Sequence, residues 1–132
     1  MQNMSGSGDK SALGLDGNVT ALIGYIVGIV ALIEIFIEKD NKWVRFHAIQ
    51  SVLYHVAAFV VIFALMIVGG IVAAILSQIS AVLSLVGILI YILGLLLWLG
   101  WLVGMIYGAL KAYQGVTFKY PIVGNMAEKW SN

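Results

Sequence analysis

A cluster of polar side chains stands at the start of the longest apolar run of the chain. The stretch WVRFHAIQSVLYH, residues 43–55, carries guanidinium, imidazole, amide and hydroxyl groups, and no charged residue then occurs until Lys111. In a helix, positions i, i+3, i+4, i+7 and i+8 lie on one face. That spacing is met by His47, Gln50, Ser51, Tyr54 and His55. The stretch therefore predicts a polar stripe, about two turns long, on one face of a helix.

The chemistry open to this stripe depends on its acidic partners. Glu34 lies about one turn inside the preceding apolar run, and matching depths across the turn near residue 41 places it opposite His47. The same matching places Glu38 near Arg45. Ionisable groups inside a membrane are candidates for function by default, with a partner to be named. We expect Glu34 to pair with His47 or Arg45.

Three interpretations of the polar cluster are open. A closed, hydrogen-bonded clamp could fix the two helices, or a polar cavity could hold a proton, an ion, a lipid headgroup or a partner segment. A metal site is disfavoured, because His47 and His55 are about 12 Å apart along a helix axis, too far for both to bind one ion at about 2 Å. No catalytic triad is indicated, and we expect no metal, cofactor or catalytic residue. The candidate cluster is Glu34, Arg45, His47, Gln50, Ser51, Tyr54 and His55.

The composition indicates a membrane protein. Of the 132 residues, 62% are hydrophobic and 10% charged, whereas a soluble domain has about a quarter charged residues. A membrane span needs about 20 apolar residues, and the run between Arg45 and Lys111 exceeds this several-fold. A net charge of +1 gives no electrostatic case for nucleic-acid binding. The lack of cysteine excludes disulfides and thiol chemistry.

The chain is predicted to be an all-α integral membrane bundle of three transmembrane helices, with four as the alternative. A flexible amino-terminal tail, 1–17, and a short amphipathic carboxyl-terminal surface tail, 114–132, flank the membrane domain, 18–113. The turn near 38–45 and the residues after the last span are basic, which predicts that both are cytoplasmic and that the amino terminus is outside. The expected helices are about 19–37, 44–76 and 81–113, the last ended by Gly115.

Glycines spaced four residues apart suggest close helix packing. Such spacing lets two helix backbones approach closely in lipid. The packing could be within the chain, or it could form a seam between copies or with another membrane subunit. The candidate packing residues are Gly24 and Gly28 in the first helix and Gly94, Gly100, Gly104 and Gly108 in the last.

Three segments resemble a family of small prokaryotic membrane proteins. They are GLDGNVTALIGYIVG, IEKDNKWVRFHAIQS and AYQGVTFKYPIVGNMAEK, and the resemblance covers residues 14–129. The family is related to the Tic-twenty subunit of the chloroplast inner-envelope import machinery and includes magnetosome membrane proteins that influence crystal size. The resemblance implies a bundle of three or four spans and no known catalytic activity.

We therefore predict a non-enzymatic structural, assembly or accessory subunit of a prokaryotic cell membrane. Its partners would be the lipid bilayer and either further copies of itself or other membrane subunits. The alternative is a protomer of an oligomeric transport or channel component, with the polar stripe lining a path.

Overall fold

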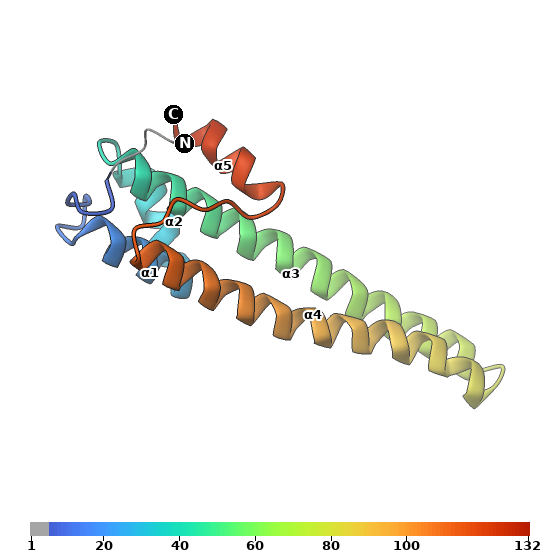
Figure 1. The fold of residues 1–132 in the computed structure, drawn as a ribbon. Helices are drawn as coiled ribbons and strands as arrows, with labels where there is room; N and C mark the ends of the chain where they lie inside the picture. Colours follow the sequence, from blue (N-terminus) through green and yellow to red (C-terminus); the bar gives the residue numbers. More distant parts are fainter. Residues whose placement is uncertain (1–5) are drawn as a thin grey trace. The chain divides into compact units, whose positions relative to one another are not determined.

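The structure is a computed structural model, and it describes residues 6–132 of the chain. These residues form five α-helices and no β-strand, apart from one isolated bridge between Lys10 and Asp16 (Figure 1). The prediction of an all-α fold is confirmed. The helices are α1 (Gly17–Ile26), α2 (Gly28–Ile37), α3 (Lys42–Ser77), α4 (Ala81–Tyr113) and α5 (Val123–Ser131).

The two long helices, α3 and α4, lie within two residues of their predicted bounds. Asn41 caps the start of α3, because its side-chain oxygen accepts a hydrogen bond from the backbone N–H of Val44 at 3.2 Å. Beyond the end of α4, Gly115 takes the left-handed conformation expected of it, with φ +77°. Backbone bonds from Gly115 and Val116 return to the last turn of α4, which is a Schellman motif. Both helices are long and apolar enough to cross a membrane.

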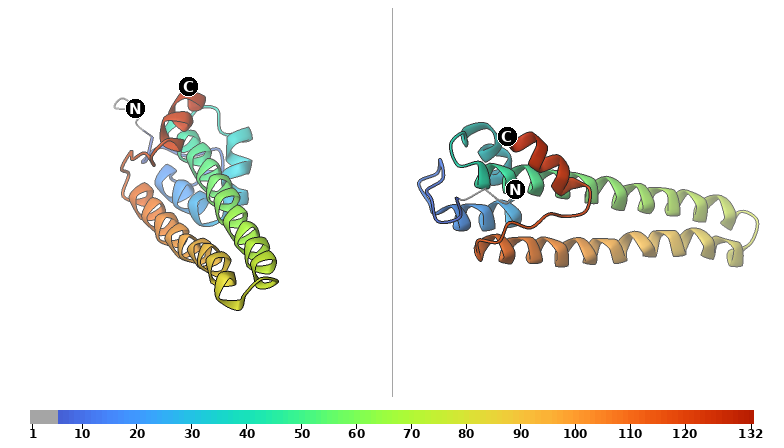
Figure 2. Two further views of the ribbon diagram at one scale, coloured as in Figure 1. Left: turned by 90° about the vertical axis from the view of Figure 1, so that its right-hand side faces the viewer. Right: turned by 45° about the horizontal axis from the view of Figure 1, so that its top comes forward.

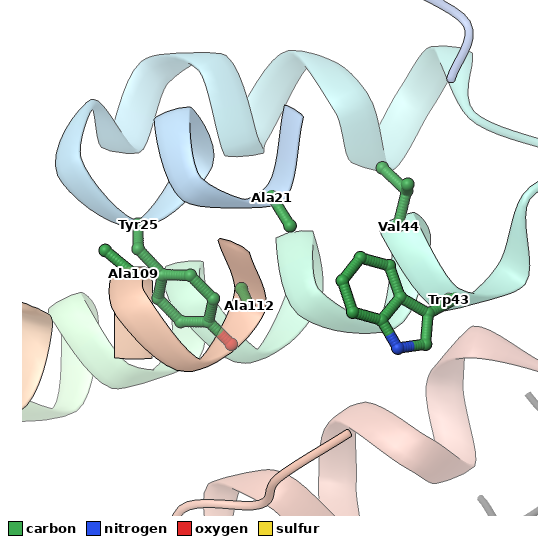
Figure 3. Close-up of a cluster of buried hydrophobic side chains, with 6 residues drawn as sticks. All are labelled: Ala21, Tyr25, Trp43, Val44, Ala109 and Ala112. Atoms are coloured by element: carbon green, nitrogen blue, oxygen red, sulfur yellow. The ribbon is translucent and has the colours of Figure 1, made fainter. Parts of the chain in front are cut away.

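The predicted first span, 19–37, is not one helix. The chain leaves helical geometry at Val27, with φ −113° and ψ 92°, and α2 folds back on α1 (Figure 3). Each of these helices has ten residues and extends about 15 Å. The hydrocarbon core is about 30 Å thick, so neither helix can cross it alone. The expectation of three transmembrane helices is therefore not confirmed: the described residues contain two helices long enough to span and one short helix pair.

Residues 6–16, predicted to be a flexible tail, are folded against the turn between α2 and α3. The side-chain amide of Asn41 donates to the carbonyl of Gly6 at 2.8 Å, and the N–H of Ala12 donates to the Glu38 carboxylate at 2.6 Å. Ser11 and Thr20 share a buried hydrogen bond. The amino-terminal segment and the turn were expected on opposite sides of the membrane, and these contacts place them together instead. Residues 1–5 of the predicted tail lie outside the described residues.

The chain divides into two compact units. Unit 1 comprises the residues up to His55 together with Gly104–Asn132, and unit 2 comprises Val56–Val103. In unit 1, the rings of Tyr25 and Trp43 are fully buried among small side chains of α1 and α4 (Figure 3). The core cluster of unit 1 is Ala21, Tyr25, Trp43, Val44, Ala109 and Ala112.

Unit 2 is an antiparallel pair of helices in very close contact. A Cβ atom on Gly87 would lie 2.1 Å from the backbone nitrogen of Ala73, and one on Gly69 would lie 2.5 Å from that of Tyr91. The two backbones therefore touch, which only glycine permits.

At the tip of unit 2, the serine hydroxyls bond to their own helices. Ser77 donates to the carbonyl of Ala74, and Ser84 donates to that of Ala81. The hydroxyl of Ser80 accepts from the N–H of Val82, at the start of α4.

Candidate functional site

The centre of the polar cluster is Tyr25, on α1. Its hydroxyl lies 2.8 Å from Nδ1 of His47 and accepts a hydrogen bond of 2.8 Å from the side-chain amide of Gln50. Because the hydroxyl accepts from Gln50, its own hydrogen is available to His47. Burial raises the pKa of the Tyr25 phenol well above its usual range, partly offset by the Gln50 bond, so the hydroxyl remains a donor. The chain Gln50–Tyr25–His47 thus joins α1 to α3.

The amide of Gln50 also holds the carboxyl-terminal segment. Its nitrogen donates to the carbonyl of Phe118 at 3.2 Å, and its oxygen accepts from the N–H of Tyr120 at 3.0 Å. Gln50 is fully buried, and an unpaired buried amide would be costly. One side chain of α3 therefore fixes both α1 and the segment that leads to α5.

Ser51 and His55 bond to the backbone at the end of α1. The Ser51 hydroxyl donates to the carbonyl of Gly24 at 2.9 Å, and Nε2 of His55 lies 2.9 Å from the carbonyl of Tyr25, to which it donates. The last carbonyls of a helix have no partner within the helix. These two side chains of α3 supply partners for the carbonyls at the end of α1, so this half of the stripe caps the helix before the break at Val27.

The expected pairs of Glu34 are not formed. Both carboxyl oxygens of Glu34 are buried without a hydrogen-bond partner among the described residues, and so is Nε2 of His47. Arg45 instead donates to the backbone carbonyl of Glu38 at 3.3 Å. Glu38 is tied down by backbone N–H groups of Ala12 and Asn41. Burial, helped by the charge of Glu38, raises the pKa of Glu34 to about 8, so the carboxyl is held as the neutral acid at neutral pH.

Aromatic rings enclose the remaining members of the cluster. The ring of Tyr54 stacks on Tyr120, with centroids 4.3 Å apart and planes 12° apart. The ring of His47 meets Trp43 edge-on at 4.3 Å between centroids. The seven predicted residues therefore all lie in unit 1, where His47, Gln50, Ser51 and His55 meet around the end of α1, while Glu34 has no partner within the cluster.

The predicted glycine faces are mostly covered from within the chain. Gly24 packs on Ala31 of α2, and Gly28 packs on His55. Gly94 packs against Met66 and Ile62. The hydroxyls of Tyr54 and Tyr120 occupy the space that a Cβ on Gly104 and Gly108 would need. Only at Gly100, among the six, does a Cβ meet nothing within 4 Å.

Tyr25, Tyr120 and Trp43 belong to the site but were not predicted from the sequence. Trp43 donates to the Thr117 hydroxyl at 2.9 Å, and Tyr120 donates to the carbonyl of Gly104 at 2.5 Å. One signal could have found Tyr25, since it is a polar-tipped aromatic inside an otherwise apolar stretch and buried tyrosine hydroxyls need a partner.

The family of the chain follows from its sequence profile. The profile of the magnetosome magnetite crystal formation protein family matches residues 12–127. The chain belongs to this family. The magnetosome part of the predicted resemblance is thereby confirmed, and the kinship with Tic-twenty stays a prediction.

Archaeal members of the UPF0132 membrane proteins are similar over nearly the whole chain. One from Methanocaldococcus jannaschii is 33% identical over 123 residues, which is 92% of this chain and 94% of the relative. A second from the same organism is 35% identical, covering 90% of this chain and 73% of the relative. One from Archaeoglobus fulgidus is 33% identical, over 85% of this chain and 92% of the relative. No solved structure matches. The magnetosome-family chain is thus a membrane protein, with α3 and α4 as its candidate spans.

Proposed function

We propose that this chain is a non-enzymatic structural subunit of a prokaryotic membrane that associates side by side with further copies of itself. The proposal rests on one observation: the side chains of the polar cluster form their hydrogen bonds within the chain. Gln50 forms hydrogen bonds with the Tyr25 hydroxyl and the carboxyl-terminal segment. Ser51 and His55 form hydrogen bonds with the backbone carbonyls of Gly24 and Tyr25. Groups committed in this way hold a fold together and are not available to a substrate.

The face of α4 around Gly100 supports association between copies. Leu96 and Val103, which flank Gly100 on the same face at helical spacing, are 59% and 69% exposed. A glycine between large apolar residues offers a shallow notch, in which a second helix can pack closely in lipid. The other candidate glycines are occupied by side chains of the same chain, so we assign the notch at Gly100 to the contact.

The family description supports an accessory role. The family is described as one of magnetosome magnetite crystal formation proteins. Within residues 6–132 no group of three or more His, Asp or Glu side chains could hold a metal ion. We therefore assign any part this chain plays in such a process to the organisation of the membrane.

Cysteine cross-linking tests the association. The chain has no cysteine, so Gly100→Cys introduces a unique thiol. Gly70→Cys is the matched control, because its Cβ also meets nothing within 4 Å. In liposomes, we expect the yield of the cross-linked Gly100→Cys dimer to persist as the lipid-to-protein ratio is raised. The yield of the Gly70→Cys dimer should decrease, because that dimer forms only by random collision. Equal loss of both on dilution would contradict self-association.

One observation favours the alternative, a transport protomer. Among residues 6–132 the Glu34 carboxyl and Nε2 of His47 are buried without a hydrogen-bond partner, and such groups can hold a proton in transit. Proton flux into liposomes that contain the protein tests this function. The alternative requires a proton flux above that of empty liposomes. Glu34→Gln should abolish this flux and Glu38→Gln should keep it. A flux equal to that of empty liposomes rejects the alternative.

A further inference from the structure

The outer face of the α1–α2 pair is apolar and uncovered. Residues 17–37 contain one charged side chain, Glu34, and it is buried. Large apolar side chains cover the rest of the surface, and the most exposed are Phe36 at 73% and Ile29 at 70%. The exposed apolar residues of the pair are Ile26, Val27, Ile29, Leu32, Ile33, Phe36 and Ile37.

The polarity of the pair changes along its length. At one end lie Asp16, before α1, and the charged turn that includes Asp40, after α2. At the other end, where α1 passes into α2, the exposed residues are Ile26, Val27 and Ile29. The distance between the two ends is about 15 Å, which equals half of the ~30 Å hydrocarbon thickness. The pair therefore has the length and polarity of an insertion into one leaflet.

At the apolar end of the pair, the backbone carbonyls freed by the break at Val27 have hydrogen-bond partners within the protein. In hydrocarbon, irregular backbone is tolerated only where its polar groups are satisfied by protein. The break at Val27 frees carbonyls at the end of α1, and the side chains of Ser51 and His55 bond to those of Gly24 and Tyr25. The N–H of Val27 itself bonds to the carbonyl of Ile23 at 2.7 Å. These contacts make the break compatible with hydrocarbon, where backbone polar groups need protein partners.

Within unit 1, α5 also packs against α3. Ala127 of α5 belongs to a buried cluster with Phe46 and Ile49 of α3, and Ile35 of α2 packs against this cluster (Figures 1 and 2). The α5 segment carries an exposed ion pair between Lys119 and Glu128 at 2.5 Å. The segment of α5 therefore carries charged side chains at its surface, whereas residues 17–37 contain only the buried Glu34.

We propose that α1 and α2 form a re-entrant pair that enters the membrane tip first from the side of the 38–41 turn, with lipid acyl chains against its outer face. Residues 6–16, the turn and the carboxyl-terminal tail then share one side of the membrane. This arrangement agrees with the hydrogen bonds from Asn41 to Gly6 and from the Asn18 side chain to the carbonyl of Tyr113.

Sidedness is tested with single cysteines and a membrane-impermeant maleimide. Suitable exposed positions are Gly8, Asp40, Gln78 and Asn132, and a Cβ on Gly8 meets nothing within 4 Å. In intact vesicles of phosphatidylethanolamine and phosphatidylglycerol, we expect Gly8→Cys, Asp40→Cys and Asn132→Cys to react from one side and Gln78→Cys from the other. Reaction of Gly8→Cys together with Gln78→Cys would overturn the proposal, because residues 17–37 would then cross the membrane.

Depth is tested with nitroxide labels on Val27→Cys and Phe36→Cys in the same vesicles. Oxygen concentrates in hydrocarbon and a nickel chelate remains in water, so the ratio of their relaxation effects reports depth. We expect oxygen to dominate at both positions, more strongly at residue 27 than at residue 36. Dominance of the nickel chelate at residue 27 would place the pair in water. Protection of residue 27 from both reagents would mean that protein, such as a second copy, covers the face. Either result would overturn the proposal.

Discussion

The two units hold their helices together by different means. Unit 1 joins α1, α3 and the carboxyl-terminal segment through buried side-chain hydrogen bonds centred on Tyr25 and Gln50. Unit 2 brings α3 and α4 together through direct backbone contact at Gly69 and Gly87. In lipid, water exclusion does not drive helices together, so close packing and hydrogen bonds must do so. The difference shows that hydrogen bonds fix short, irregular segments, whereas glycine contacts suffice for long regular helices.

The largest effect is expected from Gly87→Ala, which breaks the close contact of unit 2. The new methyl would lie 2.1 Å from the backbone nitrogen of Ala73, and one helix must move away. Overpacking of this kind costs about 3 kcal/mol, measurable by unfolding in mixed detergent and dodecyl sulfate. Gly70→Ala is the control, since it adds its methyl to open space and gains helix propensity. Equal stability of the two variants would contradict a backbone contact at Gly87.

The next effect concerns the unpaired carboxyl of unit 1. The pKa of Glu34 is raised from 4.5 to about 8, so the folded state binds more protons than the unfolded state between these values. Stability should therefore fall as the pH rises from about 4.5 to 8. Glu34→Gln should remove this fall, as melting temperatures in detergent would show. Glu38→Gln should keep most of the fall, because burial is the larger cause of the raised pKa of Glu34. A fall that survives Glu34→Gln belongs to another group.

A smaller loss is expected when the hydrogen bonds of unit 1 lose their centre. Tyr25→Phe keeps the ring but leaves Gln50 and His47 without the hydroxyl they share. A buried polar group left without its partner costs about 2 kcal/mol. The same dodecyl sulfate titration measures the loss. Tyr113→Phe, at an exposed ring, should be neutral, and a similar loss in both variants would mean that the hydroxyl of Tyr25 is not the centre.

The smallest effect is expected at the surface of unit 1. Lys10 and Asp16 form an exposed ion pair at 2.6 Å. Exposed pairs contribute about 0.5 kcal/mol or less and are screened by salt. Lys10→Ala should therefore shift the melting temperature very little. A shift as large as that of Tyr25→Phe would show that the amino-terminal segment depends on this pair more than on its bonds to Asn41 and Glu38.

The long helices could be predicted from the sequence because their signals are local. The uninterrupted apolar run defined α3 and α4, and Gly115 marked the end of α4. The break at Val27 could not be predicted in this way. No proline or polar residue stands there, and the partners of the freed carbonyls, Ser51 and His55, come from another helix.

The same break explains what was missed in the site. Depth matching assumed one straight helix over 19–37, which would bring Glu34 opposite His47. Because the chain turns back at Val27, α1 presents Tyr25 to His47 and Gln50 instead. Helical period thus identified the polar face of α3, but its partners depend on the three-dimensional path of the neighbouring segment.

The self-contained tip of unit 2 has a consequence for how the protein enters a membrane. Between α3 and α4 only a short turn must be carried through the hydrocarbon, and the hydroxyls of Ser77 and Ser84 already bond to their own helices. Moving such hydroxyls out of water does not leave them without partners. The two helices can therefore be inserted together as a preformed pair, with their loop following the apolar segments and no large hydrophilic region to translocate.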